Sequence, residues 1–210
     1  MTSFNMDSSY HQINLQIMID ELGEDRVNAI LSTFSCPKNK DVEQFLKRKA
    51  ILFSKQGFSK TFLVFWSSND QKEKYLIGYY TIANKAIEIE KKSVSNGTYK
   101  KIQKFKVASF SNDSCLIPAI LIGQLGKNYA AGNDTLIKGK ELLKMAVDRI
   151  QDIQYEVGGK FAYLECEDKE KLINFYTENG FVLFGKRTLD RDETLIEGDY
   201  LMQLLTYIHS

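Results

Sequence analysis

The residues with the clearest potential for chemistry lie in the segment 165–181. An apolar run ends there, a short amphipathic stretch with Phe175 and Tyr176 follows, and Asn-Gly at 179–180 closes that stretch before a new apolar run. This pattern predicts a strand, a helix and a second strand. A phenol with an ordinary pKa of about 10 is protonated at neutral pH, so Tyr176 can donate a proton. The alternative is that Tyr176 is an aromatic anchor that packs the helix on the sheet.

A general base that accepts a proton while Tyr176 donates one can come from the end of the strand predicted before the helix of Tyr176. The alternation of side chains along a strand places Glu165 on the face opposite Leu164 and Cys166, which makes Glu165 the first candidate. Glu167 and Asp168 are alternatives, although Glu167 fits a solvated loop charge and Asp168 fits the N-terminal cap of the helix. Cys166 is either a nucleophile or a buried inert thiol, and burial is the simpler interpretation.

The composition of the 210-residue chain predicts one α/β domain over residues 1–210. Apolar residues make up 43% of the chain, enough for a continuous core, and 26% are charged, as is ordinary for a protein surface. The 28 Lys and Arg residues against 27 Asp and Glu residues leave a formal charge of +1. We therefore expect no whole-molecule field that attracts nucleic acid or an anionic membrane, so any such binding must be local.

The chain has few cysteine and histidine side chains that could bind a metal ion. Cys36, Cys115 and Cys166 show no C-x-x-C spacing, and their odd number suits a reducing compartment, so we expect a cytoplasmic protein. His11 and His209 lie near the termini and are expected to be exposed end residues, so we expect no metal site. Neither an export signal nor a run of about 18 apolar residues is present, so no membrane is expected as a partner.

Periodicity along the rest of the chain predicts the elements that would position these residues. Residues 115–125 are nearly continuously apolar, which predicts a central strand buried on both faces. Residues 142–157 repeat at helical spacing and end at Gly158-Gly159, which predicts a long helix. The remaining predictions are strands at 12–18, 61–66, 75–83, 161–166, 181–184 and 199–208, and helices at 24–31, at 42–53 before Gly57 and around 172–176.

A lysine-rich segment lies before the central strand. It is predicted to be a surface insertion at about 91–110. It is either a solvated loop or frayed helix, or a patch that contacts a polyanion. Its six lysines, with no acid among them, are Lys91, Lys92, Lys100, Lys101, Lys104 and Lys106.

The F-Y-x-x-x-G-F string at 175–181 and the order of elements resemble the GCN5-related N-acetyltransferase family. The resemblance implies an α/β acyl-CoA N-acyltransferase fold, in which helices flank a central mixed and splayed sheet. It implies acetyl-CoA as co-substrate, no metal, and direct transfer to a primary amine without an acyl-enzyme. Tyr176 would lie beside the thioester sulfur as the general acid, and Glu165 would be a water-assisted base.

The resemblance also implies which residues contact the co-substrate. The family binds the pantetheine arm where the central strand leaves its parallel neighbour, and backbone groups there support the thioester oxyanion. The glycines at 123 and 126 also fit a simple bend in the strand. The predicted pantetheine contacts are Gln124, Leu125 and Gly126, and Asn174 is predicted to be a further co-substrate contact.

The family's pyrophosphate loop, Q/R-x-x-G-x-G/A, is altered in this chain. Asp134, Ile137 and Gly139 stand at its three signature positions, and only Gly139 agrees. A carboxylate at Asp134 would repel a phosphate, whereas Lys138 and Lys140 would add positive charge. The predicted contacts are therefore Lys138, Gly139 and Lys140, with a weakened or lost site as the alternative.

Short strings near the front resemble acetyltransferase toxins that modify aminoacyl-tRNA, namely Phe34-Ser-Cys36, Asp41-Val-Glu43, Phe45-Leu46 and Gly78-Tyr79. The predicted acceptor is an amine on a small molecule, a peptide or an aminoacyl-tRNA. Two alternatives remain open at this point: a non-catalytic acyl-CoA-binding or protein-interaction module with this fold, and a toxin that acetylates aminoacyl-tRNA. A homodimer is plausible because the closing strands leave an exposed edge.

Overall fold

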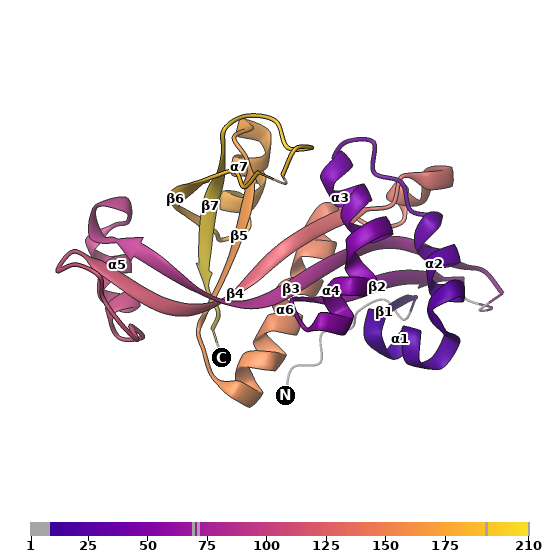
Figure 1. Cartoon of the computed structure of the whole chain (residues 1–210), viewed down its shortest axis with the longest axis horizontal. Coiled ribbons are helices and arrows are strands. Elements are labelled where there is room, and N and C mark those ends of the chain that lie inside the picture. The colour runs from indigo at the N-terminus through magenta and orange to yellow at the C-terminus, as the bar shows by residue number, and fades with distance from the viewer. Residues whose placement is uncertain (1–8, 69, 71, 192, 210) are drawn as a thin grey trace. The chain divides into compact units, whose positions relative to one another are not determined.

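The structure is a computed structural model that describes residues 9–68, 70, 72–191 and 193–209 (Figure 1). Its strands are β1 (Tyr10–Asn14), β2 (Lys60–Ser67), β3 (Lys74–Glu90), β4 (Ser114–Lys127), β5 (Phe161–Glu167), β6 (Val182–Thr188) and β7 (Tyr200–Tyr207). Its α-helices are α1 (Leu15–Leu22), α2 (Glu24–Ser32), α3 (Lys40–Gln44), α4 (Ala50–Gln56), α5 (Asn96–Gln103), α6 (Gly139–Val157) and α7 (Glu170–Glu178). A π-helical turn, Phe45–Lys49, joins α3 to α4, and short 3₁₀ turns span Lys91–Ser93 and Ala130–Thr135.

The strands form one mixed sheet of seven in the order β1-β2-β3-β4-β5-β7-β6. β4 is fourth in that order, which confirms the predicted central strand and the α/β fold class. The parallel register of β4 and β5 covers Ile120–Ile122 and Ala162–Leu164, whereas β7 pairs antiparallel with both β5 and β6. A parallel pair needs a long crossover, and α6 supplies it between β4 and β5.

The chain forms two compact units by its contacts. The first contains the residues up to Thr81 together with Gln124–Lys144, and the second contains Ile82–Gly123 together with the residues from Met145 onward. The elements β3, β4 and α6 divide their residues between the two. One domain over residues 1–210 stays a prediction.

In the first unit, the predicted strand at 12–18 is wrong beyond Asn14. The side chain of Asn14 accepts a hydrogen bond from the backbone N–H of Gln16 at 2.9 Å and caps α1, which begins at Leu15. The buried residues Leu15 and Met18 are three apart, the spacing of one helix face, and Ile17 is 55% exposed. The polar cap therefore overrides the alternating pattern.

The two other helices predicted for this region are confirmed. α2 covers the predicted 24–31, and α3, the π-helical turn and α4 together cover 42–53. The side chain of Asn39 caps α3 by accepting from Val42 N–H, and Gly57 ends α4 in the left-handed region at φ 74°. The core of this unit joins these helices to β2 and β3 through Leu15, Val27, Leu31, Phe34, Leu46, Leu63 and Tyr79.

In the second unit, the predicted strands and helices after residue 145 are confirmed. α6 ends at Val157 and Gly158 follows at φ 84°, while Gly180 follows α7 at φ 89°. Asp168 is not the cap of α7, because Lys169 occupies the N-cap position and the Asp168 carboxylate accepts a hydrogen bond from the Tyr200 hydroxyl at 2.9 Å. The main core cluster of this unit contains Ile117, Ala119, Phe161, Tyr163, Phe184 and Leu205.

The lysine-rich segment contains the helix α5 and is attached to this core. The side chain of Ser95 caps α5 by accepting from Thr98 N–H, and Tyr99 and Ile102 are buried. None of the described helices combines the length and apolar character that a bilayer crossing needs. Among the described residues, no cluster of three or more His, Cys, Asp or Glu side chains could hold a metal ion.

Candidate active site

Tyr176 lies in α7, the helix that follows β5. Its ring packs edge-on against Phe175 and Phe181, with centroid distances of 5.1 and 6.1 Å. Burial raises the pKa of Tyr176 above its ordinary value, with a smaller contribution from the nearby Cys166 thiol. In the described part of the chain, no group hydrogen-bonds the Tyr176 hydroxyl. The phenol therefore keeps its proton well above neutral pH. Among the described residues, no acceptor takes a hydrogen bond from it.

Glu165 lies on β5 and is held on two sides. Its Oε2 accepts from Arg187 Nε at 2.9 Å, and its Oε1 accepts from Gln203 Nε2 at 2.8 Å. The register explains this contact, because Glu165 of β5 lies directly opposite Gln203 of β7. The carboxylate is thus fixed in orientation, with each of its oxygens accepting a hydrogen bond. Its role as base stays a prediction.

The sequence analysis did not identify Arg187 as the partner of Glu165, because the residues around Arg187 form no recognisable motif. Its guanidinium also binds Glu193 with two hydrogen bonds of 2.8 and 2.9 Å, and these ion pairs raise its pKa further above the ordinary value. The network ties β5, β6 and the loop after β6 together. The Arg187 partners Glu165 and Glu193 lie 22 and 6 residues away in sequence, so no local sequence pattern could have revealed them.

The other polar residues at the end of β5 have local partners. Burial raises the pKa of the Cys166 thiol to about 11, so this side chain stays protonated and favours the inert interpretation. Glu167 accepts from Lys169 Nζ at 3.1 Å, and Asp168 accepts from Tyr200. Neither carboxylate is free to act without breaking a contact.

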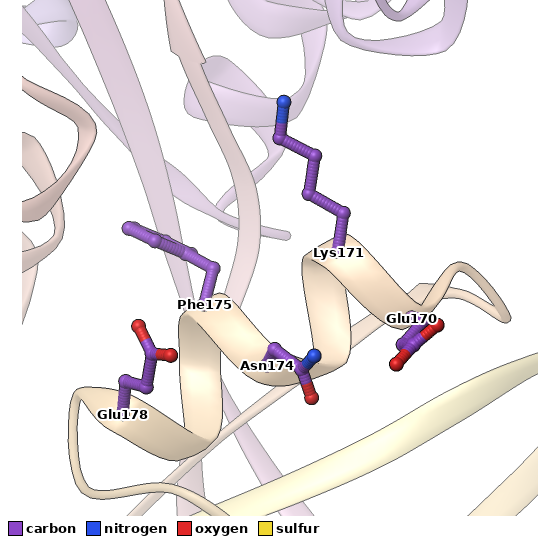
Figure 2. A pocket seen from close by; sticks show the side chains of 5 residues that line it. All are labelled: Glu170, Lys171, Asn174, Phe175 and Glu178. Carbon is purple, nitrogen blue, oxygen red and sulfur yellow. The ribbon is translucent and has the colours of Figure 1, made fainter.

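An open pocket of about 470 Å³ runs along α7. All five side chains that line it come from this helix: Glu170, Lys171, Asn174, Phe175 and Glu178 (Figure 2). Asn174, which was predicted to contact the co-substrate, therefore lies at an accessible hollow beside the helix of Tyr176. The pocket supplies the amide of Asn174 and the ammonium group of Lys171, which can bind polar parts of a ligand, together with the carboxylates of Glu170 and Glu178.

The last residues of β4 lie in the first unit and are closely packed. Gln124 donates through Nε2 to Asp41 Oδ2 at 2.8 Å. A Cβ at Gly126 would overlap Val42 Cγ1, so glycine is needed there for the close approach of α3. The Tyr79 hydroxyl donates to the carbonyl of Val42 at 2.5 Å and fixes the same helix. The packing role of Gly126 is therefore clear, and the roles of Gln124, Leu125 and Gly126 towards a co-substrate stay predictions.

The start of α6 offers groups for an anion. Within the described residues, the backbone amides of Gly139 and Lys140 donate no hydrogen bond, and the exposed ammonium groups of Lys138 and Lys140 form no ion pair. A helix N-terminus with free amides and nearby lysines fits a phosphate. Against this, Glu141 Oε2 accepts from the backbone N–H of Lys138 at 2.7 Å and adds negative charge.

The loop between β4 and α6 is anchored by Asn128, a residue that the sequence did not single out. Asn128 is 1% exposed, donates through Nδ2 to the Leu76 carbonyl at 2.7 Å, and accepts through Oδ1 from the N–H groups of Ser35 and Ala130. Its own N–H donates to Ile77. One buried amide thus fixes the loop that leads to the start of α6.

Glu43 belongs to the string that resembles the tRNA-directed toxins, and it has a structural role. It is 9% exposed, accepts from the Cys36 backbone N–H at 2.8 Å and accepts from Lys47 Nζ at 3.0 Å. These contacts, led by the Cys36 hydrogen bond, lower the pKa of the Glu43 carboxyl. The carboxylate therefore holds the loop before α3 against that helix.

The lowered pKa of Glu43 predicts a pH-dependent contribution to stability. Because the folded-state pKa lies below the unfolded value, the contribution is present above about pH 4.3 and is lost as the pH falls through the folded-state pKa. We expect Glu43→Gln to lower the free energy of unfolding by about 1–2 kcal/mol at pH 7, with a smaller difference at pH 3. Urea unfolding at both pH values measures this.

Glu24→Gln is the matched control for Glu43, since it removes the same charge from an exposed pair with Lys55. Its effect is expected to stay within about 0.5 kcal/mol. A difference between wild type and Glu43→Gln that is equal at pH 3 and pH 7 would contradict the proposed linkage.

Solved structures match this chain along nearly its whole length. A tyrosine-to-phenylalanine mutant of the AtaT toxin matches with TM-score 0.62 and 17% identity over 99% of this chain and 94% of that chain. A tyrosine-to-phenylalanine mutant of KacT matches with TM-score 0.61 and 16% identity over 93% and 94%. AtaT complexed with acetyl-methionyl-tRNAfMet matches with TM-score 0.59 and 17% identity over 92% and 93%.

No protein-family model matches the chain, and no curated protein matches it. The similarity found is therefore one of three-dimensional structure, at 16–17% sequence identity. The fold expected from the F-Y-x-x-x-G-F string is confirmed: this chain has the fold of the GCN5-related N-acetyltransferases, in the form seen in AtaT and KacT.

Proposed function

We propose that this protein transfers the acetyl group of acetyl-CoA to a primary amine. The observation that carries the proposal is the match over 99% of the chain to the fold of the AtaT toxin, together with a tyrosine in α7 whose hydroxyl donates no hydrogen bond among the described residues. One of the matched structures, AtaTR, is bound with acetyl-CoA. The transfer is an N-acetyltransferase activity with acetyl-CoA as co-substrate and without metal.

The transfer requires that one proton be removed from the amine nitrogen and one be delivered to the departing sulfur. The amine nitrogen attacks the thioester carbonyl, the C–S bond breaks, and an amide and a thiol result. Tyr176 donates its proton to the departing sulfur, and the attacking nitrogen loses a proton to water that Glu165 orients. A phenol with a raised pKa is a weaker acid. In this proposal Tyr176 contributes to catalysis because it is fully protonated and lies next to the departing sulfur.

The remaining predicted residues bind the co-substrate in this proposal. Gly126, Leu125 and Gln124 contact the pantetheine arm, and the start of α6 binds the pyrophosphate through free amides and the ammonium groups of Lys138 and Lys140. Gly139 allows the backbone to approach the phosphates closely. Asn174 contacts the adenosine side or the pantetheine amides from the pocket on α7.

We propose an aminoacyl-tRNA as the acceptor. A matched structure is AtaT complexed with acetyl-methionyl-tRNAfMet, and the strings near the front of this chain, which include Asp41 and Glu43, resemble toxins that modify aminoacyl-tRNA. The ordinary pKa of an α-amine, about 8, lies more than two units below that of a lysine side chain, so a much larger fraction of α-amines than of lysine amines is unprotonated at neutral pH. Small-molecule and peptide amines are the competing acceptors.

A non-catalytic acyl-CoA-binding module is the second candidate function. Two observations favour it: Arg187 holds the Glu165 carboxylate, which opposes the role of Glu165 as base, and the Glu141 carboxylate adds negative charge at the start of α6, which opposes phosphate binding there. Such a module binds acetyl-CoA without turnover.

Calorimetry with acetyl-CoA, followed by a thiol-release assay with methionyl-tRNA, separates these functions. Binding with thiol release supports the transferase, and binding alone supports the module. No binding at millimolar acetyl-CoA contradicts both. Release with a peptide or small amine and none with methionyl-tRNA would leave the transferase and exclude this acceptor.

A further inference from the structure

The helix α5 presents a basic surface that the proposed chemistry does not use. We define the α5 lysine cluster as Lys100, Lys101, Lys104 and Lys106. All four side chains are exposed, and no Asp or Glu occurs in the sequence from 91 to 112. Local positive charge is thus high although the whole chain carries only +1.

The cluster sits on a rigid support. Tyr99 and Ile102 are 3% and 0% exposed on the buried side of α5. Phe105, one residue after Lys104, packs edge-on against Phe161 and Tyr207 with centroid distances of 5.5 and 6.2 Å. The segment is therefore an anchored helix, which lowers the ordering cost of binding a partner.

The lysines of the cluster lack partners of their own. Lys91 and Lys92, just before α5, pair with Asp113 and Glu90. In the described part of the chain no acidic side chain pairs with the four cluster lysines. Lys100 and Lys101 lie in the last turn of α5 and Lys104 is its C-cap residue, so the charges gather at the C-terminal end of the helix. The positive charge of the cluster is therefore not neutralised by a described acidic side chain and is available to an external anion.

We propose that the α5 lysine cluster binds the phosphate backbone of RNA and, resting on the proposed function, holds the tRNA that carries the acceptor amine. A group of exposed ammonium groups at the end of α5 and just after it can match the repeated charge of a nucleic-acid backbone. Phe110, which follows the cluster and is 72% exposed, supplies a face on which a base can stack.

The test compares two variants with the same charge change. One is Lys100→Gln/Lys101→Gln/Lys104→Gln. Its control is Lys55→Gln/Lys72→Gln/Lys74→Gln, in which three exposed lysines of the first unit are replaced. The probe is a deacylated initiator tRNA transcript, and fluorescence anisotropy is measured from 50 to 200 mM salt. Thermal unfolding of both variants checks that the helix remains folded.

The α5 variant is expected to bind about 10–100-fold more weakly at the lowest salt, with a salt slope lower in magnitude by about 2–3, and the control to bind like wild type. Equal affinities in the α5 variant and the control would overturn the proposal. Equal loss for a DNA duplex of the same length would overturn the assignment to RNA.

Failure of the proposed function is distinguishable from failure of this inference. Loss of tRNA binding in the α5 variant, with no thiol release by wild type, supports the RNA surface and contradicts the transferase. Thiol release from methionyl-tRNA with the same KM in wild type and the α5 variant supports the transferase and contradicts the RNA surface. A raised KM with an unchanged kcat supports both.

Discussion

Replacing Tyr176 with phenylalanine is expected to lower the rate of acetyl transfer about 10²–10⁴-fold, with little change in the affinity for acetyl-CoA. The phenylalanine ring keeps the edge-on contacts with Phe175 and Phe181, so only the proton donor is lost. Single-turnover thiol release measures the rate, and calorimetry measures the affinity.

Tyr155→Phe is the matched control, because Tyr155 is 85% exposed on α6 and loses the same hydroxyl. Its rate is expected to equal that of wild type. If Tyr176 is only an aromatic anchor, Tyr176→Phe will keep full rate, and that result would exclude it as the general acid. A non-catalytic module would show no rate in any of the three proteins.

The raised pKa of Tyr176 also fixes the expected pH dependence. Because the folded-state pKa lies above the ordinary value of about 10, the phenol remains protonated as the pH rises from 7 to 10. The rate of the wild-type protein should therefore show no decline from tyrosine ionisation in that range. A decline in wild type that is absent from Tyr176→Phe would contradict the assignment of this pKa.

The largest loss of stability is expected from Asn128→Ala, at about 3 kcal/mol. The change removes the acceptor of the Ser35 and Ala130 N–H groups and the donor to the Leu76 carbonyl, and each buried group left unpaired costs about 1–3 kcal/mol. Partial access of water to Ser35 and Ala130 offsets part of that sum. Urea unfolding followed by the fluorescence of Trp66, the single tryptophan, measures the loss in the first unit.

Asn133→Ala is the control for the same loop, since no hydrogen bond of the Asn133 side chain is present among the described residues. Its effect is expected within about 0.5 kcal/mol. Asn128→Asp keeps the acceptor but loses the donor to Leu76, so it should also destabilise the protein. Equal stabilities of Asn128→Ala and Asn133→Ala would show that the buried amide does not anchor the loop.

The sequence predicted those helices and strands that are marked by a long pattern of apolar residues within one continuous segment. The run at 115–125 and the helical repeat at 142–157 need no distant partner to be recognised, because a buried strand and an amphipathic helix are written into consecutive residues. The segment 12–18 failed because alternation over a few residues cannot compete with one side-chain cap at Asn14. The prediction that Asp168 caps α7 failed for a related reason, because its carboxylate accepts a hydrogen bond from the Tyr200 hydroxyl.

The sequence by itself determined the fold class, the strand–helix–strand that carries Tyr176, and the lysine-rich composition of α5, because each depends on residue types at short spacing. Only the tertiary structure decided that Glu165 is held by Arg187 and Gln203, that Asn128 anchors the loop before α6, and that α5 is packed into a core. These contacts join residues far apart in the chain, and their energies depend on strand register and burial, which no local pattern encodes.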